Sequence, residues 1–195
     1  RQELILVDKN NMKVKTFLPY ASSTGNTTDQ LYDLGVLEDQ LYLFYRSGLL
    51  ICYNLKSHQE IYRQKLPDEL PKGKYENTSY VVPGNNTFYQ LRNGSQGGVM
   101  LNYDITRKKW NIVFQTDYRL NSLSIDKDSS IWVSCYMGLW NIDAGLINKQ
   151  YIPNLKLVDG RTINTEVSTL YNDNQGGMWL GTLDRGILYL SLIHI

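Results

Sequence analysis

Residues 178–190 read MWLGTLDRGILYL, a stretch with a large aromatic residue at its second position and a glycine seven residues later. Three earlier stretches share this plan: LYLFYRSGLL (41–50), TFYQLRNGSQGGVML (87–101) and IWVSCYMGLWNI (131–142). Their aromatic residues are Tyr42, Phe88, Trp132 and Trp179, so successive copies start 46, 44 and 47 residues apart. A fixed period of this length is the signature of a repeat architecture.

Each repeat has four short apolar runs separated by polar turns. The first run precedes the aromatic residue, the second contains it, and the third follows the glycine. The third runs lie at 49–54, 99–104 and 139–143, and the fourth at 61–66, 110–114 and 149–152. No run continues the i, i+3, i+4, i+7 spacing of an amphipathic helix, so the runs are predicted to be strands.

This pattern predicts an all-β chain of β-propeller blades, about four in number, each made of four antiparallel strands. A β-sandwich or barrel has no reason to repeat at a fixed period, and a parallel β-helix repeats at a shorter one. We expect units at about 1–20 (third and fourth strands only), 30–70, 78–117, 120–155 and 166–190 (first three strands), followed by a tail at 191–195. The aromatic residues Tyr42, Phe88, Trp132 and Trp179 are expected to pack between blades as core.

The incomplete units at both ends suggest part of a larger, perhaps seven-bladed, propeller. The alternative is that these ends complement each other and close a four-bladed ring. As part of a larger propeller, the chain taken alone is expected to leave apolar blade faces open.

The composition excludes several kinds of site. The 195 residues include 20 Lys+Arg and 19 Asp+Glu, a net charge of +1, which argues against a dedicated nucleic-acid surface. No apolar run reaches the ~20 residues of a membrane helix, so no membrane contact is expected. With histidine only at His58 and His194, neither a histidine metal site nor a Ser-His-Asp triad is expected, and no cofactor is predicted.

Two smaller questions stay open at this point. Cys52 and Cys135 are interpreted as buried free thiols, with a disulfide between them as the alternative. The acidic turns at Asp126, Asp128 and Asp173 could bind calcium, but hairpin turns favour Asp for backbone reasons, and we predict no metal.

The stretch Trp179-Leu180-Gly181-Thr182, preceded by 173–177 and followed by Gly186-Ile187, resembles the two-component regulator propeller repeat. Residues 128–143 follow the same pattern, with Trp132 and with Gly138 before Leu139. The first two repeats depart from it, because Tyr42 and Phe88 replace the tryptophan.

The resemblance implies a periplasmic sensor region of a bacterial hybrid two-component histidine kinase, of the type found in Bacteroidetes. Such a region binds an oligosaccharide released from a glycan and activates the matching utilisation genes. The expected partners are therefore an oligosaccharide or other small periplasmic ligand, the remaining blades and the downstream sensor domains, and a homodimer of the full-length protein stays open. No kinase motif is present in this chain, so the segment is expected to be non-enzymatic and the kinase to lie elsewhere in the full-length protein.

The candidate ligand-binding residues lie where the turn between the second and third strands comes out beside the connection to the next repeat. We call this end of each sheet the rim. Its predicted ligand-binding side chains are those of Arg46, Arg92, Tyr136, Arg185, Tyr118 and Arg119. Tyr20, Tyr75 and Arg161 lie on the same connections. The planar guanidinium of arginine can form paired hydrogen bonds with the hydroxyls or carboxylate of a sugar, especially an acidic one, and a tyrosine ring can pack against the sugar ring. Arginine is, however, also ordinary in an exposed turn.

The leading hypothesis is thus a non-catalytic, glycan-sensing propeller. The alternatives are a protein-interaction or spacer propeller without a small-molecule ligand and a propeller lyase or glycosidase. The enzyme alternative needs converging acids or a histidine near the axis, and the repeat supplies none.

Overall fold

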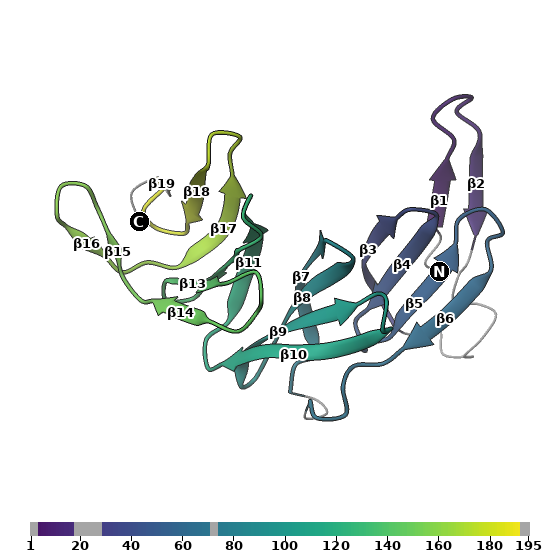
Figure 1. Cartoon of the computed structure of the whole chain (residues 1–195), viewed down its shortest axis with the longest axis horizontal. Coiled ribbons are helices and arrows are strands. Elements are labelled where there is room, and N and C mark those ends of the chain that lie inside the picture. Colours follow the sequence, from purple (N-terminus) through teal and green to yellow (C-terminus); the bar gives the residue numbers. More distant parts are fainter. Residues whose placement is uncertain (1–3, 18–28, 71–73, 192–195) are drawn as a thin grey trace. The chain divides into compact units, whose positions relative to one another are not determined.

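The computed structural model describes residues 4–17, 29–70 and 74–191. Its elements are strands, numbered β1 to β19 (Figure 1). The chain divides into two compact units, Arg1–Lys65 and Leu66–Ile195. Within the described residues, no helix is long and apolar enough to cross a membrane.

The first unit contains a two-stranded and a four-stranded antiparallel sheet, in the orders β1-β2 and β3-β4-β5-β6. The strands are β1 (Leu4–Val7), β2 (Val14–Phe17), β3 (Leu31–Leu37), β4 (Gln40–Tyr45), β5 (Leu50–Asn54) and β6 (Glu60–Gln64). Leu4 of β1 packs into the core that Leu41, Leu43 and Ile51 form on one face of the larger sheet.

The second unit holds two four-stranded sheets, β7-β8-β9-β10 and β11-β12-β13-β14, a hairpin β15-β16, and the sheet β17-β18-β19. The first sheet comprises β7 (Asn77–Gly84), β8 (Thr87–Gly94), β9 (Gly97–Asp104) and β10 (Lys109–Thr116). The second comprises β11 (Leu120–Ile125), β12 (Ile131–Cys135), β13 (Leu139–Ile142) and β14 (Lys149–Ile152). The remaining strands are β15 (Leu155–Lys156), β16 (Thr162–Ile163), β17 (Val167–Asn172), β18 (Gly177–Thr182) and β19 (Ile187–Ser191).

These sheets confirm the predicted all-β class with four antiparallel strands per repeat. The predicted tail is placed only in part, because Ser191 ends β19 and residues 192–195 lie outside the described residues.

The turns repeat as well as the strands. Every turn between a first and a second strand contains one residue with positive φ: Glu38 (53°), Asn86 (52°), Ser129 (67°) and Gly176 (88°). The turns between third and fourth strands do the same at Met12, His58, Lys108 and Leu146. One left-handed residue per turn reverses the chain within a few residues, so the same backbone geometry recurs on different side chains.

Neighbouring sheets of the second unit are joined by apolar cores. Leu123 of β11 packs with Leu91, Met100 and Phe114 of the preceding sheet. Leu170 of β17 packs in the same way in the core that contains Trp132. The facing sides of these neighbouring sheets are therefore buried against each other, which a single isolated sheet cannot achieve.

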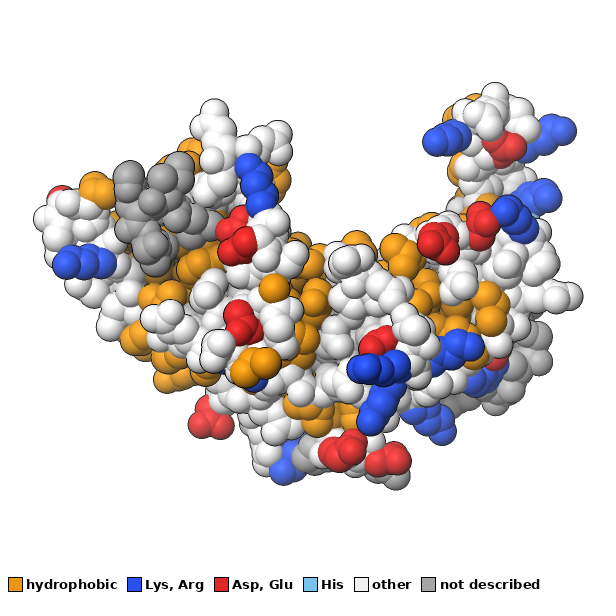
Figure 2. Space-filling view, viewed as in Figure 1, with side chains coloured by type: hydrophobic (Ala, Val, Ile, Leu, Met, Phe, Trp, Pro, Cys, Tyr) orange, Lys and Arg blue, Asp and Glu red, His pale blue; other side chains and the backbone are white. Residues whose placement is uncertain are grey.

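The four repeat aromatics do not share one environment. Tyr42, Phe88 and Trp132 are 1%, 0% and 5% exposed, whereas Trp179 is 44% exposed. The expected burial of Trp179 is therefore corrected: it occupies the equivalent position on β18, but no described residue covers its face of the sheet as β17 covers that of Trp132. Figure 2 shows that hydrophobic side chains also reach the visible surface elsewhere on both units.

The two cysteines are buried free thiols, in β5 and β12. Cys135 donates from its Sγ to the Met137 carbonyl at 3.1 Å, and burial raises the pKa of this thiol.

Candidate ligand-binding rim

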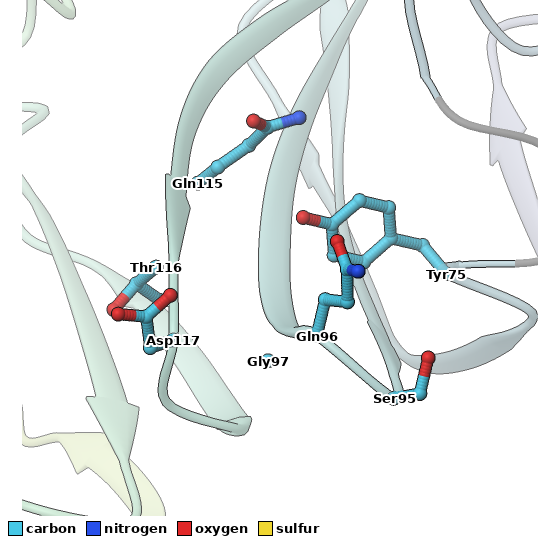
Figure 3. Close-up of a pocket in the computed structure, with 7 residues that line it drawn as sticks. All are labelled: Tyr75, Ser95, Gln96, Gly97, Gln115, Thr116 and Asp117. Atoms are coloured by element: carbon cyan, nitrogen blue, oxygen red, sulfur yellow. The ribbon is translucent and has the colours of Figure 1, made fainter.

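A pocket of about 530 Å³ opens at the rim of the β7–β10 sheet. Tyr75 comes from the connection that leads into β7, and Ser95, Gln96 and Gly97 come from the β8–β9 turn. Gln115, Thr116 and Asp117 come from the end of β10 and the connection that follows it. Figure 3 shows Tyr75 and Gln96 on one side of the pocket and Thr116 and Asp117 on the other.

One wall of the pocket is held by the side chain of Arg92. The Nε of Arg92 donates to the Tyr75 carbonyl at 2.7 Å, and its Nη2 donates to the Glu76 carbonyl at 3.3 Å. Arg92 is only 1% exposed, so its guanidinium serves the protein's own backbone. The expectation that this arginine reaches out to a ligand is therefore corrected: Arg92 positions Tyr75 instead.

The opposite wall is held by Asn93, the next residue along β8. Its Nδ2 donates to the Leu120 carbonyl at 2.7 Å, and its Oδ1 accepts from the Leu120 backbone N–H at 2.8 Å. The amide thus imitates a paired backbone group, and it ties the start of β11 to the end of β8. Arg92 and Asn93 together fix the two connections between which the pocket lies.

Gly97 lets the chain pass close beneath the pocket. Its φ is +93°, and a Cβ at this position would lie 2.1 Å from the Thr116 carbonyl oxygen. The sequence pattern indicated Gly94 as the turn glycine of this repeat. Gly94 does not have a positive φ, and the need for glycine there comes from a close backbone contact. A Cβ on Gly94 would lie 1.4 Å from the Lys74 carbonyl oxygen, so only glycine at this position allows the connection that leads into β7 to pass so close to β8.

Three further predicted residues come together beside the pocket. Tyr118 and Arg119 directly follow Asp117 on the β10–β11 connection. The Arg119 carbonyl accepts from the backbone N–H of Tyr136, at 3.0 Å, which ties the connection to the β12–β13 turn. Tyr118 and Tyr136 are 37% and 56% exposed, and Arg119 is also exposed.

Tyr118 is supported from below by an aromatic stack. Its ring lies 5.7 Å from that of Tyr151, at an interplanar angle of 23°. Tyr151 in turn contacts Trp140, at 4.9 Å, and its hydroxyl donates to the Met137 carbonyl. Burial, with smaller contributions from Cys135 and Tyr118, raises the pKa of Tyr151 to about 12, so the phenol stays neutral.

The remaining predicted residues lie elsewhere. Arg46 is exposed on the β4–β5 turn of the first unit. Arg185, on the β18–β19 turn, is exposed and forms an ion pair with Asp184 at 3.2 Å. Arg161 pairs with Asp159 at 2.7 Å, and Tyr20 lies outside the described residues.

Most of the residues that line the pocket were not predicted from the sequence. Tyr75 was indicated by its place on a connection, but no motif pointed to Gln96, Gln115, Thr116 or Asp117 as ligand-binding residues. The available signal was positional, because Gln96 lies in a turn, Gln115 and Thr116 at the end of β10, and Asp117 on the connection that follows.

The acidic turns use their carboxylates locally. Asp128 accepts from the Ser130 N–H at 2.9 Å, and Asp173 accepts from the N–H groups of Gln175 and Gly177, both at 2.8 Å. Among the residues that the structure describes, no group of three or more His, Cys, Asp or Glu side chains could hold a metal ion.

The comparisons with known proteins agree on the fold. Residues 163–184 match the model of the two component regulator propeller family. The extracellular domains of two putative hybrid two component systems of B. thetaiotaomicron, BT4673 and BT3049, superpose with TM-scores of 0.68 and 0.64 at 17% and 14% identity. They match over 97% and 95% of this chain and 24% and 23% of their own, so the chain spans about a quarter of their length.

A third match is the β-propeller domain of Cps50 (Swd1) from Myceliophteria thermophila. It superposes with a TM-score of 0.65 at 12% identity, over 98% of this chain and 64% of its own. No curated protein matches the sequence. The chain is therefore a β-propeller chain that carries a two component regulator propeller repeat at residues 163–184.

Proposed function

We propose that this chain is a non-catalytic ligand-recognition propeller of a two-component signalling protein, and that it detects an oligosaccharide derived from a glycan. The repeat at 163–184 supports the signalling role. The extracellular domains of similar fold support an extracytoplasmic location, which we propose to be the periplasm. The histidine kinase of this proposal belongs to other parts of the full-length protein.

The rim pocket carries the ligand part of the proposal. Its seven lining residues offer hydroxyl groups on Tyr75, Ser95 and Thr116, amides on Gln96 and Gln115, and the carboxylate of Asp117. Such groups form hydrogen bonds with the hydroxyls of a sugar, and a tyrosine ring offers an apolar surface to the sugar ring. Among the described residues, the lining contains no arginine or lysine, which favours a neutral saccharide over an acidic one.

The neighbouring residues extend this surface beyond one sugar ring. Tyr118 and Tyr136 are exposed aromatic side chains beside the pocket, and the stack on Tyr151 restricts the motion of Tyr118. An aromatic surface that is already ordered loses little conformational entropy on binding. The arrangement therefore suits a chain of several sugar units.

The proposal is tested by titrating neutral and acidic oligosaccharides into the 195-residue chain, with isothermal calorimetry and thermal shift as readouts. We expect a neutral oligosaccharide to bind, and Gln96→Ala and Asp117→Ala each to weaken binding about tenfold through the loss of one or two hydrogen bonds. Gln175→Ala removes the same side chain as Gln96→Ala from the β17–β18 turn and should leave binding unchanged.

The outcomes separate the candidate functions. Binding that persists in both rim variants would place the site elsewhere and refute the rim assignment. If no oligosaccharide stabilises the chain, a protein-interaction or spacer propeller replaces the sensor.

A further inference from the structure

The β8–β9 hairpin is longer than the corresponding hairpins of the other sheets. In each of those sheets the repeat aromatic residue is paired with a residue of the third strand, and two further residue pairs follow towards the rim. On β8 and β9, six further pairs follow the pair of Phe88 with Tyr103, and the last of them joins Gly94 to Gly97. At about 3.4 Å of rise per residue, the paired strands therefore reach ~14 Å further towards the rim.

The extra length lies at the rim end only. At the opposite end, the aromatic residue of every sheet lies one or two residues after the start of its strand, at Gln40, Thr87, Ile131 and Gly177. The turn glycine follows the aromatic residue by nine residues at Gly97, against six or seven at Gly48, Gly138 and Gly186. We call residues 91–100, which form the four additional pairs and the turn, the extension.

The rim pocket is built on the extension. Ser95, Gln96 and Gly97 of its lining form the tip of the extension. Gln115 and Thr116 of β10 are paired with residues of the extension on β9. Five of the seven lining residues therefore belong to the extension or lie beside it on the neighbouring strand (Figure 3).

The extension also holds the two connections that flank the pocket. Arg92, which donates to the Tyr75 carbonyl, and Asn93, which exchanges two hydrogen bonds with Leu120, are both part of it. A Cβ on Gly98 would lie 2.6 Å from Cγ of Leu120, so glycine lets the extension lie close against the start of β11. These contacts order the walls before a ligand arrives, which lowers the entropic cost of binding.

The β11–β14 sheet shows the same turn without an extension. A Cβ on Gly138 would lie 2.1 Å from the Ile152 carbonyl oxygen, as one on Gly97 would from that of Thr116. Tyr151 therefore holds the place of Gln115. Its hydroxyl donates to the Met137 carbonyl, in the turn of its own sheet. The side chain at this place closes onto a short hairpin, whereas beside the extension it lines a pocket.

We propose that the extension is the specificity-determining element of the rim, and that Gln96 at its tip sets, with Asp117, the charge of the saccharide that binds. The inference rests on the proposed function, because it names what selects the ligand of that same pocket. Gln96 and Asp117 lie on opposite sides of the pocket (Figure 3). Among the described lining residues, Asp117 alone is charged, so no cation compensates a second carboxylate.

Deletion of residues 95–98 from the full chain tests the role of the extension. Arg92 and Val99, which are paired in the native hairpin, are then joined by Asn93-Gly94. Asn-Gly is the dipeptide that a two-residue hairpin turn favours, so we expect the sheet to form. Binding of the saccharide should weaken about a hundredfold, since at least two hydrogen-bonding side chains are lost.

A change of selectivity tests the role of charge. The probes are neutral gluco-, xylo- and arabino-oligosaccharides and acidic oligogalacturonides, each titrated by calorimetry. In the double variant Gln96→Lys/Asp117→Asn, we expect the ratio of the acidic to the neutral dissociation constant to fall at least about tenfold. Leu183→Lys adds the same cation at an exposed position of the β18–β19 turn, which has no extension, and should leave this ratio unchanged.

The outcomes distinguish this inference from the proposed function. If the wild-type chain binds a saccharide and the deletion variant binds it equally well, the inference is refuted and the proposed function stands. An unchanged ratio in the double variant would overturn the role of Gln96 and Asp117. If the wild-type chain binds none of the probes, both proposals fail.

Far-UV circular dichroism verifies that each variant is folded. If the deletion variant does not fold, the double variant Ser95→Ala/Gln96→Ala removes both tip side chains from the intact hairpin. It must then show the loss of binding, and full binding by this variant would refute the inference.

Discussion

Replacing Asn93 with alanine removes a side chain on which both the fold and the rim pocket depend. Asn93 is 5% exposed and exchanges two hydrogen bonds, of 2.7 and 2.8 Å, with the backbone of Leu120, 27 residues away. Leu120 is fully buried, so water cannot replace the lost partner without opening the sheet. At about 1 kcal/mol for each bond, plus part of the cost of leaving buried backbone groups less well paired, we expect a loss of ~2–3 kcal/mol.

The unfolding of the second unit can be followed separately. All four tryptophans of the chain, Trp110, Trp132, Trp140 and Trp179, lie in Leu66–Ile195. Tryptophan fluorescence during urea unfolding therefore reports on the unit that contains Asn93. We expect the midpoint to fall with the slope unchanged, which indicates a loss of stability rather than a change in the surface exposed.

The control is Asn174→Ala, which removes the same side chain from an exposed turn. It should change the free energy of unfolding by no more than about 0.5 kcal/mol. If Asn93→Ala costs no more than this control, the two hydrogen bonds do not fix the start of β11 and the reasoning is refuted. If the reasoning holds, Asn93→Ala should also weaken any ligand of the rim pocket, because it releases the wall that carries Asp117.

Three other changes test separate parts of the structure. Gly97→Ala should cost more stability than Gly160→Ala, since both glycines have positive φ but only a Cβ on Gly97 would meet backbone, at 2.1 Å; equal urea midpoints would contradict this. The phenol of Tyr151 has a pKa of about 12, against 10.0 for the ordinary side chain. The folded state therefore holds a proton that the unfolded state loses above pH ~10, and stability should fall between pH ~10 and ~12. Tyr151→Phe should make that fall shallower in thermal melts, and an unchanged slope would refute the assignment. Cys52 and Cys135 are buried, so a thiol reagent should label neither in the folded chain and both after denaturation; rapid labelling of the folded chain would contradict their burial.

The sequence predicted the elements of the fold well, because their causes are local. The spacing of Tyr42, Phe88, Trp132 and Trp179 identified the repeat, and the apolar runs between turns located the strands. The left-handed turn residues were harder to recognise. Glu38, Asn86 and Ser129 share a positive φ but no side-chain type, so no sequence motif predicted this turn geometry.

The candidate site was predicted only in outline. The sequence indicated the end of the sheets at which the pocket lies, and it brought forward Tyr118, Arg119 and Tyr136, which lie near one another. It treated Arg92 as an exposed rim residue, because a turn arginine is ordinarily exposed. The structure buries its guanidinium against the Tyr75 carbonyl, a contact between residues 17 apart that no local pattern encodes.

Sequence alone therefore determined the repeat, the strand order within each sheet and the rim on which connections and turns meet, since all three follow from the period and alternation of side chains along the chain. Only the tertiary structure decided which side chains are exposed and which are buried. Trp132 and Trp179 hold the same place in the repeat, yet one is covered by the next sheet and the other is open. Burial depends on what packs against a residue, and for Trp132 those partners, Val167 and Leu170, lie more than 30 residues away in the sequence.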